Sequence, residues 1–348
     1  MNRRLYVIFM GVLPVVIALI CGGLVILFTG GNPFRTYWLL ARESFGNWTS
    51  IRNTLIASTA LLFTSTATAI GFRAGVFTLS AEGAFISGGF AAAVAGAFTM
   101  NIAGWQGIVL LLLIGSIVGA AVSLIPAMLK AYLDVDEVVS TLMFNFVIAG
   151  LVTWLVQSFF LAPNEGNAST VFIQEKYHLP ENFLGLNLSL GFGLAVLFVV
   201  LYSILIRRTR LGYDIRSLGY SKQFSKAIGV KESKTILFAM LLTGAIAGIG
   251  GAVHLSGLVH RYVSGFSAGY GFTGLAIALL AKFKPMGLIG GSLLLGAISS
   301  AGATVQLYTN IPLDIVNVLQ GFIMIAAVID GRNLIFRRKL PRRSGVNE

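Results

Sequence analysis

The sequence has very little cysteine and little charge. Cys21 is the only cysteine among 348 residues, which excludes a disulfide within the chain and a metal site built from several cysteines. Charged residues account for 11% of the chain, whereas an ordinary soluble domain has roughly 25%. The chain is instead 56% hydrophobic, with a mean hydropathy of +0.85. This composition is typical of an integral membrane protein.

Motifs for nucleotide hydrolysis and metal catalysis are missing as well. The sequence contains no Gly-Lys dipeptide, which excludes a Walker A phosphate loop, and no H-E-x-x-H zinc motif. Its histidines, His178, His254 and His260, are scattered along the chain rather than spaced as metal ligands. The string GYGFTG over 269–274 fits G-x-G-x-x-G, but it lies between apolar helices, so we interpret its glycines as a backbone break or a close-contact site. We expect no catalytic site, metal or cofactor bound by this chain.

Basic residues outnumber acidic ones by 25 to 13, and the net charge is +12. The basic residues fall mainly in short segments between long apolar runs, where they act as topology determinants that face the negatively charged cytoplasmic leaflet. A soluble basic domain that could bind nucleic acid is absent from the sequence. We therefore expect membrane lipid, and no nucleic acid, around this chain.

Apolar runs predict an all-α, polytopic membrane bundle of about ten transmembrane helices. The run over 270–283 is short for a lone span, so its helix must be tilted, partly re-entrant or shielded by its neighbours. The predicted spans cover 5–28, 52–71, 81–99, 105–129, 139–161, 188–206, 235–258, 270–283, 286–308 and 314–330.

The positions of Lys and Arg predict the orientation of the bundle. The segments 207–234 and 331–348 are rich in both, and we expect them on the cytoplasmic side, the second as a basic tail. The segment 162–187 is acidic instead and should lie on the opposite side. Together with Arg3 and Arg4 near the start of the chain, these charges place both termini in the cytoplasm.

Glycine is abundant, with 41 residues, and its spacing bears on packing. Pairs four residues apart, such as Gly115 with Gly119 and Gly244 with Gly248, let helix backbones approach closely and predict a compact bundle.

Two polar interruptions of the apolar pattern resemble each other. They are GFRAGVFTLSAEGAFISGGF over 71–90 and GYGFTGLAIALLAKFKPMGLIGG over 269–291, and each follows one long apolar run and precedes two more. We therefore predict a single transmembrane domain over 1–348, in which a four-helix unit at 52–161 is repeated at 235–330.

Charged side chains within the apolar segments are few. Arg73, Glu82, Asp314 and Asp330 all lie at or near a predicted helix end. We favour an ion pair between Arg73 and Glu82, across the intervening turn, over a role for them in an ion relay. A proton- or ion-driven carrier needs charges deep in its helices, so the energy for transport should come from outside the chain.

The segment 207–234 contains the stretch TRLGYDIRSLGYSKQFSKAIGV. Within it KQFSKAIG predicts a short helix that Ser221 caps and Gly229 ends. Phe224 and Ile228, four residues apart, would give this helix an apolar face within a basic rim. Such a helix suits docking to a soluble motor protein, and the alternative is a loop that faces lipid headgroups.

Five segments in order between about residues 50 and 330 resemble the permeases of bacterial ABC importers for simple sugars, nucleosides and branched-chain amino acids. Within that family the similarity is greatest to the nucleoside and simple-sugar permeases. The segments are GFRAGVFTLSAEGAFISGG (71–89), DEVVSTLMFNFV (136–147), TRLGYDIRSLGYSKQFSKAIGV (209–230), LTGAIAGIGGAV (242–253) and GYGFTGLAIALLAKFKPMGLIGGSLLLGAISSAG (269–302).

The resemblance implies a permease subunit that pairs with a second permease, docks two cytoplasmic ATPase subunits and receives substrate from an extracellular or periplasmic binding protein. ATP and Mg²⁺ would bind to the ATPase subunits, and import would follow alternating access. Because nucleoside members commonly use two different permeases, we expect a heteromeric pair. The resemblance places Gly219, Phe224, Ala227, Ile228 and Gly229 in the contact with the ATPase.

For the substrate, the resemblance favours a nucleoside; a simple sugar such as a pentose is the alternative, and a lone secondary transporter is less favoured. Aromatic side chains can stack on a nucleobase, and amide or imidazole groups can hydrogen-bond to ribose hydroxyls. The same residue types also pack helices together, which is the favoured interpretation of each one singly. The candidates for the substrate path are Asn53, Phe72, Phe77, Asn145, His254 and Phe272.

Overall fold

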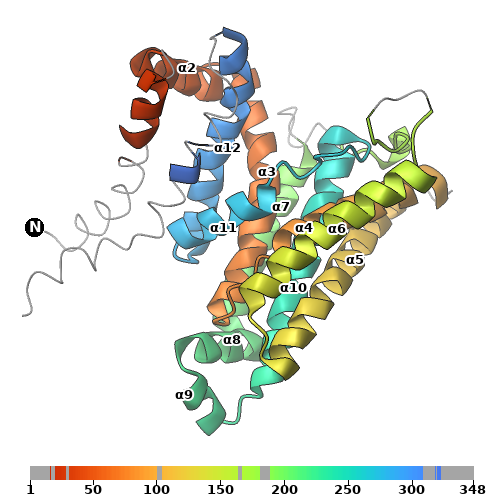
Figure 1. The fold of residues 1–348 in the computed structure, drawn as a ribbon, viewed down its shortest axis with the longest axis vertical. Helices are drawn as coiled ribbons and strands as arrows, with labels where there is room; N and C mark the ends of the chain where they lie inside the picture. The colour runs from red at the N-terminus through yellow and green to blue at the C-terminus, as the bar shows by residue number, and fades with distance from the viewer. Residues whose placement is uncertain are drawn as a thin grey trace, which may run out of the picture.

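The computed structural model describes residues 20–28, 31–99, 104–163, 167–180, 189–308 and 320–322, together with positions 16 and 318 (Figure 1). This part of the chain is helical and contains no strand, although Ser169 and Val263 form an isolated bridge. The helices are α2 (Pro33–Phe45), α3 (Trp48–Arg73), α4 (Ala81–Val94), α5 (Gly104–Leu133), α6 (Glu137–Phe159), α7 (Leu190–Arg208), α8 (Arg210–Tyr220), α9 (Lys222–Ala227), α10 (Glu232–His254), α11 (Tyr270–Leu280) and α12 (Pro285–Tyr308), with short π- or 3₁₀-helices η1 (Ala95–Thr99), η2 (Glu175–Tyr177) and η3 (Leu255–Val259).

Seven helical segments in the described part are long and apolar enough to cross a membrane. They are α3, α4 with η1, α5, α6, α7, α10 with η3, and most of α12, so seven of the predicted spans are confirmed as helices. The predicted eighth span is α11, which has only 11 residues and is indeed too short to cross alone. The predicted spans at 5–28 and 314–330 lie largely outside the described residues.

Two helices form the centre of the bundle. α3 packs against α10, and each of them also holds a pair of neighbours: α11 and α12 pack on α3, while α4 and α5 pack on α10. Figure 1 shows α2, α11 and α12 on one side of the bundle and α5 and α6 on the other. α3 is buried along most of its length, whereas α5, α6 and α7 bury one stripe each and leave apolar faces exposed.

Small residues bring α5 and α10 together. A Cβ atom on Gly119 would lie 2.8 Å from the Cα of Gly248, and a Cβ on Gly248 would lie 3.0 Å from the Cα of Gly119. A larger side chain at either position would force the backbones apart. The four-residue glycine spacing is therefore confirmed as a place where two helices approach closely.

The short helices α4 and α11 begin at a common point, the side chain of Glu82. This carboxylate is 6% exposed and accepts hydrogen bonds from the Ser267 hydroxyl and, at 2.6 Å, from the N–H of Gly271. A Cβ atom on Gly271 would lie 2.5 Å from the backbone N and Cα of Glu82, so this position requires glycine. Gly269 has φ +79° and caps the start of α11. The interpretation of GYGFTG as a backbone break and a close-contact site is confirmed.

The predicted ion pair between Arg73 and Glu82 is wrong. Arg73 Nη2 donates to the carbonyl of Phe283 at 3.0 Å, and the Tyr202 hydroxyl donates to the same carbonyl at 2.8 Å. Arg73 therefore lies beside the C-terminal end of α11, whereas Glu82 lies beside its N-terminal end. The 11 residues of α11 separate the two positions by about 16 Å along the helix.

Candidate functional site

The segment between α7 and α10 contains two helices that follow α7 without a linker. Thr209 ends α7 and caps α8, because its hydroxyl donates to the Leu205 carbonyl at 2.7 Å and accepts from the N–H of Gly212 at 3.0 Å. Gly212 leaves no space for a side chain against the Leu205 backbone. The corner between α7 and α8 is therefore tight, with the start of α8 packed on the last turn of α7.

The helix predicted around KQFSKAIG is α9, and both of its predicted ends are confirmed. The Ser221 hydroxyl accepts a hydrogen bond from the N–H of Phe224 at 3.3 Å. Gly229 has φ +84°, its N–H donates to the Lys226 carbonyl at 3.1 Å, and the next N–H donates to the Ser225 carbonyl at 3.0 Å. These two bonds form the Schellman motif, in which a left-handed glycine ends a helix.

Three large apolar side chains are exposed around α9. Tyr220 is 90% exposed, Phe224 51% and Ile228 41%, and they are spaced at four-residue intervals. Tyr220 is the last residue of α8, and the extended Ser221 separates it from α9, so we call only Phe224 and Ile228 the α9 face. Residues four positions apart lie on one side of a helix, and an exposed apolar pair of this kind suits an interaction surface.

Ion pairs fasten α9 to the start of α10. Glu232 accepts Lys222 Nζ at 3.2 Å on one carboxylate oxygen and Lys226 Nζ at 3.1 Å on the other. Both lysines are more than half exposed, so each pair stabilises the protein by less than about 1 kcal/mol. Their effect is geometric, because they hold the α9 face at a set angle to α10.

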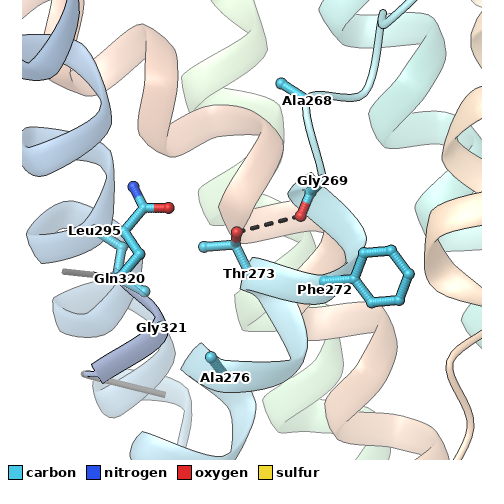
Figure 2. A pocket seen from close by; sticks show the side chains of 8 residues that line it. All are labelled: Ala268, Gly269, Phe272, Thr273, Ala276, Leu295, Gln320 and Gly321. Atoms are coloured by element: carbon cyan, nitrogen blue, oxygen red, sulfur yellow. Dashed lines mark hydrogen bonds between the residues drawn. The ribbon is translucent and has the colours of Figure 1, made fainter. Parts of the chain in front are cut away.

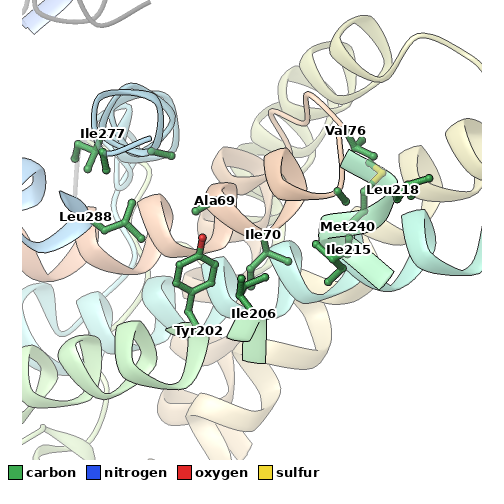
Figure 3. Packing of buried hydrophobic residues seen from close by; sticks show 14 of the residues in the cluster. Ala69, Ile70, Val76, Tyr202, Ile206, Ile215, Leu218, Met240, Ile277 and Leu288 are labelled. Atoms are coloured by element: carbon green, nitrogen blue, oxygen red, sulfur yellow. The ribbon is translucent and has the colours of Figure 1, made fainter. Parts of the chain in front are cut away.

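In contrast to α9, α8 is built into the core of the bundle. Ile215 and Leu218 are almost fully buried and belong to one cluster with Ile70, Val76 and Met240 (Figure 3). These side chains come from α8, α3, the turn after α3, and α10. α8 therefore packs directly against both central helices, α3 and α10.

Gly219, a predicted motor-contact residue, lies against the turn that joins α3 to α4. A Cβ on Gly219 would lie 3.1 Å from the N of Gly75 and still closer to the carbonyl oxygen of Arg73. Gly219 is nevertheless exposed, as are the other predicted contact residues in α9 and just after it, Phe224, Ala227, Ile228 and Gly229. Gly219 thus positions α8 on the bundle, while the α9 residues face outward.

Three predicted substrate-path residues lie near the two ends of α3, Asn53 and Phe72 within it and Phe77 in the turn that follows. Asn53 is exposed near the start of α3. Phe72 is buried at its other end and stacks on Phe77 with ring centroids 4.2 Å apart. The N–H of Phe77 donates to Glu137 at 3.2 Å, which ties this aromatic pair to the start of α6. Phe72 and Phe77 come together, and Asn53 lies far from them along α3.

Two further predicted residues lie inside the bundle. Asn145 accepts from the N–H of Gly83 at 3.0 Å and donates to the carbonyl of Leu79 at 2.9 Å, so its amide links α6 to the start of α4. His254 is buried among aromatic rings, with centroids at 5.7 Å from Phe85 and 5.3 Å from Tyr270. Both side chains are engaged in contacts between helices.

Phe272, the last predicted path residue, lines a cavity of about 230 Å³ between α11 and α12 (Figure 2). Thr273 and Gln320 supply polar groups there. The Thr273 hydroxyl donates to the Gly269 carbonyl at 3.2 Å, and the Gln320 amide donates to Ser299 at 2.7 Å. In Figure 2 the Phe272 ring points away from Thr273 and Gln320, so the hydroxyl and the amide, and not the aromatic ring, are the groups placed to meet a polar solute in this cavity.

The sequence analysis missed Ser267, which joins the starts of α4 and α11 through Glu82. A signal was present, because residues 265–269 read GFSAG and match the nucleophile pattern G-x-S-x-G. That pattern needs a preceding strand and a histidine base. In this chain a π-helix and a turn precede the motif, and the Ser267 hydroxyl donates to a carboxylate. Ser267 is a structural residue here.

Two of the histidines that are scattered in the sequence meet in the structure. The rings of His178 and His260 stack with centroids 3.8 Å apart. Within the described residues, no group of three or more His, Cys, Asp and Glu side chains could hold a metal ion.

The chain is similar to ABC transporter permeases along most of its length. The chain is 26% identical to the nucleoside ABC transporter permease protein NupB of Lactococcus lactis, over 99% of this chain and 96% of the relative. It is 26% identical to the guanosine ABC transporter permease protein NupP of Bacillus subtilis, over 93% and 94%. It is 25% identical to the glucose ABC transporter permease protein TsgB13 of Haloferax volcanii, over 90% and 85%. No solved structure matches the chain.

A family model described as "Branched-chain amino acid transport system / permease component" matches residues 50–328. This match covers α3 to α12, and therefore both central helices and the segment with α8 and α9. The chain belongs to this family of multi-pass ABC importer permeases, which are transport subunits and not enzymes.

Proposed function

We propose that this ABC importer permease translocates nucleosides and that cytoplasmic ATPase subunits drive it through the segment 207–234. The observation that carries the proposed coupling is the contrast between α8 and α9. α8 is buried in the core of the bundle, while the α9 face is exposed and held by ion pairs. A docked motor protein can therefore bind α9 and move α3 and α10 through their contacts with α8.

The transport cycle we propose is alternating access. Binding and hydrolysis of ATP and Mg²⁺ on the partner subunits change the motor's contacts with Phe224, Ala227, Ile228 and Gly229, and only contacts that differ between nucleotide states can bias the permease. Gly219 would pass the motion on to the bundle, because its backbone lies against the turn between α3 and α4. The orientation follows, with 207–234, both termini and the basic tail 331–348 in the cytoplasm.

We further propose that the single permease domain is built on two related units, 52–161 and 235–330. The packing supports this division: α3 holds α11 and α12 from the second unit, and α10 holds α4 and α5 from the first. Under the proposed repeat α3 corresponds to α10, α4 to α11 and α5 to α12. The two short helices would then be equivalent, and they meet at Glu82.

A nucleoside is the favoured substrate because two relatives aligned along more than nine-tenths of this chain carry nucleoside or guanosine in their names. A simple sugar is the second candidate, since a glucose permease is 25% identical. NupB and NupC, both similar to this chain, are nucleoside permeases of one organism, which supports a pair of different permeases. An extracellular or periplasmic binding protein would deliver the substrate.

The substrate path we propose includes the cavity at Phe272. At about 230 Å³ it is smaller than the roughly 300 Å³ at which small-molecule sites begin, so a second permease should complete it. Asn145 and His254 would act indirectly, because their side chains join helices. Phe72 with Phe77 would lie at the cytoplasmic end of the path, and Asn53 at its outer end.

The test is uptake of labelled nucleosides, pentoses and glucose by cells that make this chain with its partner subunits. Phe224→Asp places a charge on the α9 face and should abolish uptake at unchanged protein level. Gln223→Asp is the matched control, because Gln223 is exposed on the same helix beside that face and should tolerate the same charge.

Uptake of nucleosides but not sugars by the wild type would support the substrate assignment, and the reverse would replace it with a sugar. Uptake that survives Phe224→Asp would overturn the proposed motor contact. Uptake that also survives removal of the ATPase subunits would point to a lone carrier.

A further inference from the structure

A second cavity lies on the outside of the bundle, at the end that carries α8. It has a volume of about 630 Å³ and is formed by the C-terminal half of α7, the first turns of α12 and the end of α3. The residues that matter here, which we call the basic groove, are Arg73, Arg207, Lys284, Val200, Ile204 and Met286.

The charged part of the basic groove is entirely positive. Arg207 and Lys284 are exposed, and no carboxylate of the described residues lines the cavity. Arg73 Nη2 donates to the Phe283 carbonyl, its guanidinium also contacts the Tyr202 hydroxyl, and its Nε is buried with no hydrogen-bond partner among the described residues. None of the three cations has an ion pair with a described residue, so an anion placed between them would find uncompensated positive charge.

The rest of the basic groove is apolar. Val200 is 47% exposed, Ile204 48% and Met286 80%, and all three belong to helices with the length and hydropathy of membrane spans. Val200 and Ile204 lie on the side of α7 opposite to the buried stripe that includes Ala195 and Tyr202, while Val199 of that stripe also lines the groove. The groove therefore changes along α7 from charged at Arg207 to apolar at Ile204 and Val200, and an exposed apolar side of a span suits contact with lipid chains.

We propose that the basic groove binds one anionic phospholipid, with the phosphate among Arg73, Arg207 and Lys284 and an acyl chain along α7 and the start of α12. Basic pockets between spans at the cytoplasmic face are a known way to hold anionic headgroups. A soluble sugar or nucleoside would not cover the apolar part of the groove. A neutral lipid would supply no negative charge for the three cations. Of these three solutes, a lipid with a negative headgroup is the one that satisfies both the charged and the apolar part of the groove.

Such a lipid would touch the part of the fold that links the motor segment to the substrate helices. The Phe283 carbonyl, in the turn between α11 and α12, accepts bonds from Arg73 of α3 and Tyr202 of α7. α7 continues directly into α8. The bound lipid would therefore contact α3, α7 and α12 together, and it would stabilise their relative positions close to α8.

The assignment to the cytoplasmic leaflet rests on the proposed orientation, whereas binding itself does not rest on the proposed substrate or motor contact. The experiment uses the full-length chain with its partner subunits in nanodiscs of phosphatidylcholine. Binding of labelled phosphatidylglycerol is compared with binding of phosphatidylcholine that carries the same acyl chains and label. We expect the wild type to prefer phosphatidylglycerol.

The double variant Arg207→Gln with Lys284→Gln removes two cations and should lower this preference on the order of thirtyfold. The matched control is Lys231→Gln with Lys234→Gln, which removes two exposed cations near the start of α10 and should keep the preference. Ile204→Trp fills the apolar half and should weaken binding of both lipids without a change in charge.

Equal binding of both lipids to the wild type would overturn the proposal, as would a preference that the groove variant retains. The proposal would also be overturned if the wild type bound neither lipid. That result is expected if another segment of the chain or of a partner subunit fills the groove. Phe224→Asp should bind lipid like the wild type, so a failure of the motor proposal is seen separately.

Discussion

The Ser267 hydroxyl donates a hydrogen bond to a carboxylate oxygen of Glu82, a residue 185 positions earlier in the chain. The other oxygen of the same carboxylate accepts the N–H of Gly271. One buried side chain thus joins the first turn of α4 to the start of α11. In a membrane interior, where water cannot replace a lost partner, this contact should stabilise the relative position of the two short helices.

Glu82→Ala should lower the melting temperature of the purified protein in detergent. It leaves the Ser267 hydroxyl and the Gly271 N–H without an acceptor, and each buried donor left unpaired costs about 1–3 kcal/mol. Glu82→Gln keeps one acceptor oxygen and should cost less. Glu175→Ala is the control, since Glu175 is an exposed carboxylate. Equal melting of the Glu82→Ala protein and the wild type would show that the contact does not stabilise the bundle.

Gly248→Ala should reduce the yield of folded protein. The added Cβ would lie 3.0 Å from the Cα of Gly119, so α5 and α10 would have to separate, at about 1–3 kcal/mol for an overpacked contact. Gly150→Ala in α6 is the matched control, because nothing lies within 4 Å of the added Cβ. Size-exclusion chromatography and thermal melting would report the difference. Similar behaviour of the two variants would mean that the close approach of α5 and α10 at Gly119 and Gly248 tolerates an added side chain.

Ser225→Ala and Ser221→Ala make the same change in one short helix with opposite expected results. Ser225 is fully buried and its hydroxyl has no hydrogen-bond partner in the described structure, so its removal should leave stability unchanged or raise it slightly. Ser221 caps α9, and loss of such a cap costs about 1 kcal/mol. We expect uptake to fall only for Ser221→Ala. The same uptake by both variants would argue against a role for folded α9 in coupling.

Gly219→Leu should separate docking from transmission. The leucine would run into the backbone of Arg73 and force α8 away from the turn between α3 and α4, while the α9 face stays exposed. The ATPase subunits should therefore still co-purify with this variant, although uptake is lost. Phe224→Asp should lose both uptake and co-purification of the ATPase subunits. Loss of co-purification in Gly219→Leu would instead place Gly219 in the docking surface itself.

Features that depend on neighbouring residues could be predicted from the sequence. Seven spans follow from runs of apolar residues, and α9 follows from Ser221 and Gly229, because caps and hydrogen bonds of a helix join residues a few positions apart. The close approach at Gly119 and Gly248 follows from small residues at helical spacing.

The ion pair predicted between Arg73 and Glu82 shows where such reasoning ends. The two residues are close in sequence, but the turn after α3 sends them to opposite ends of α11, where each finds other partners. His178 and His260, scattered in the sequence, stack in the structure. Proximity in sequence decides contacts within a helix, and it does not decide contacts across a turn.

The sequence by itself determined that this protein is a multi-pass membrane protein with a short capped helix in the segment 207–234, since apolar length and helix caps are local properties. Only the tertiary structure decided that Glu82 meets Ser267 and that Arg73, Arg207 and Lys284 line one groove. Those meetings depend on how closely α3, α7, α11 and α12 pack, and packing is set by the fit of side chains from distant parts of the chain.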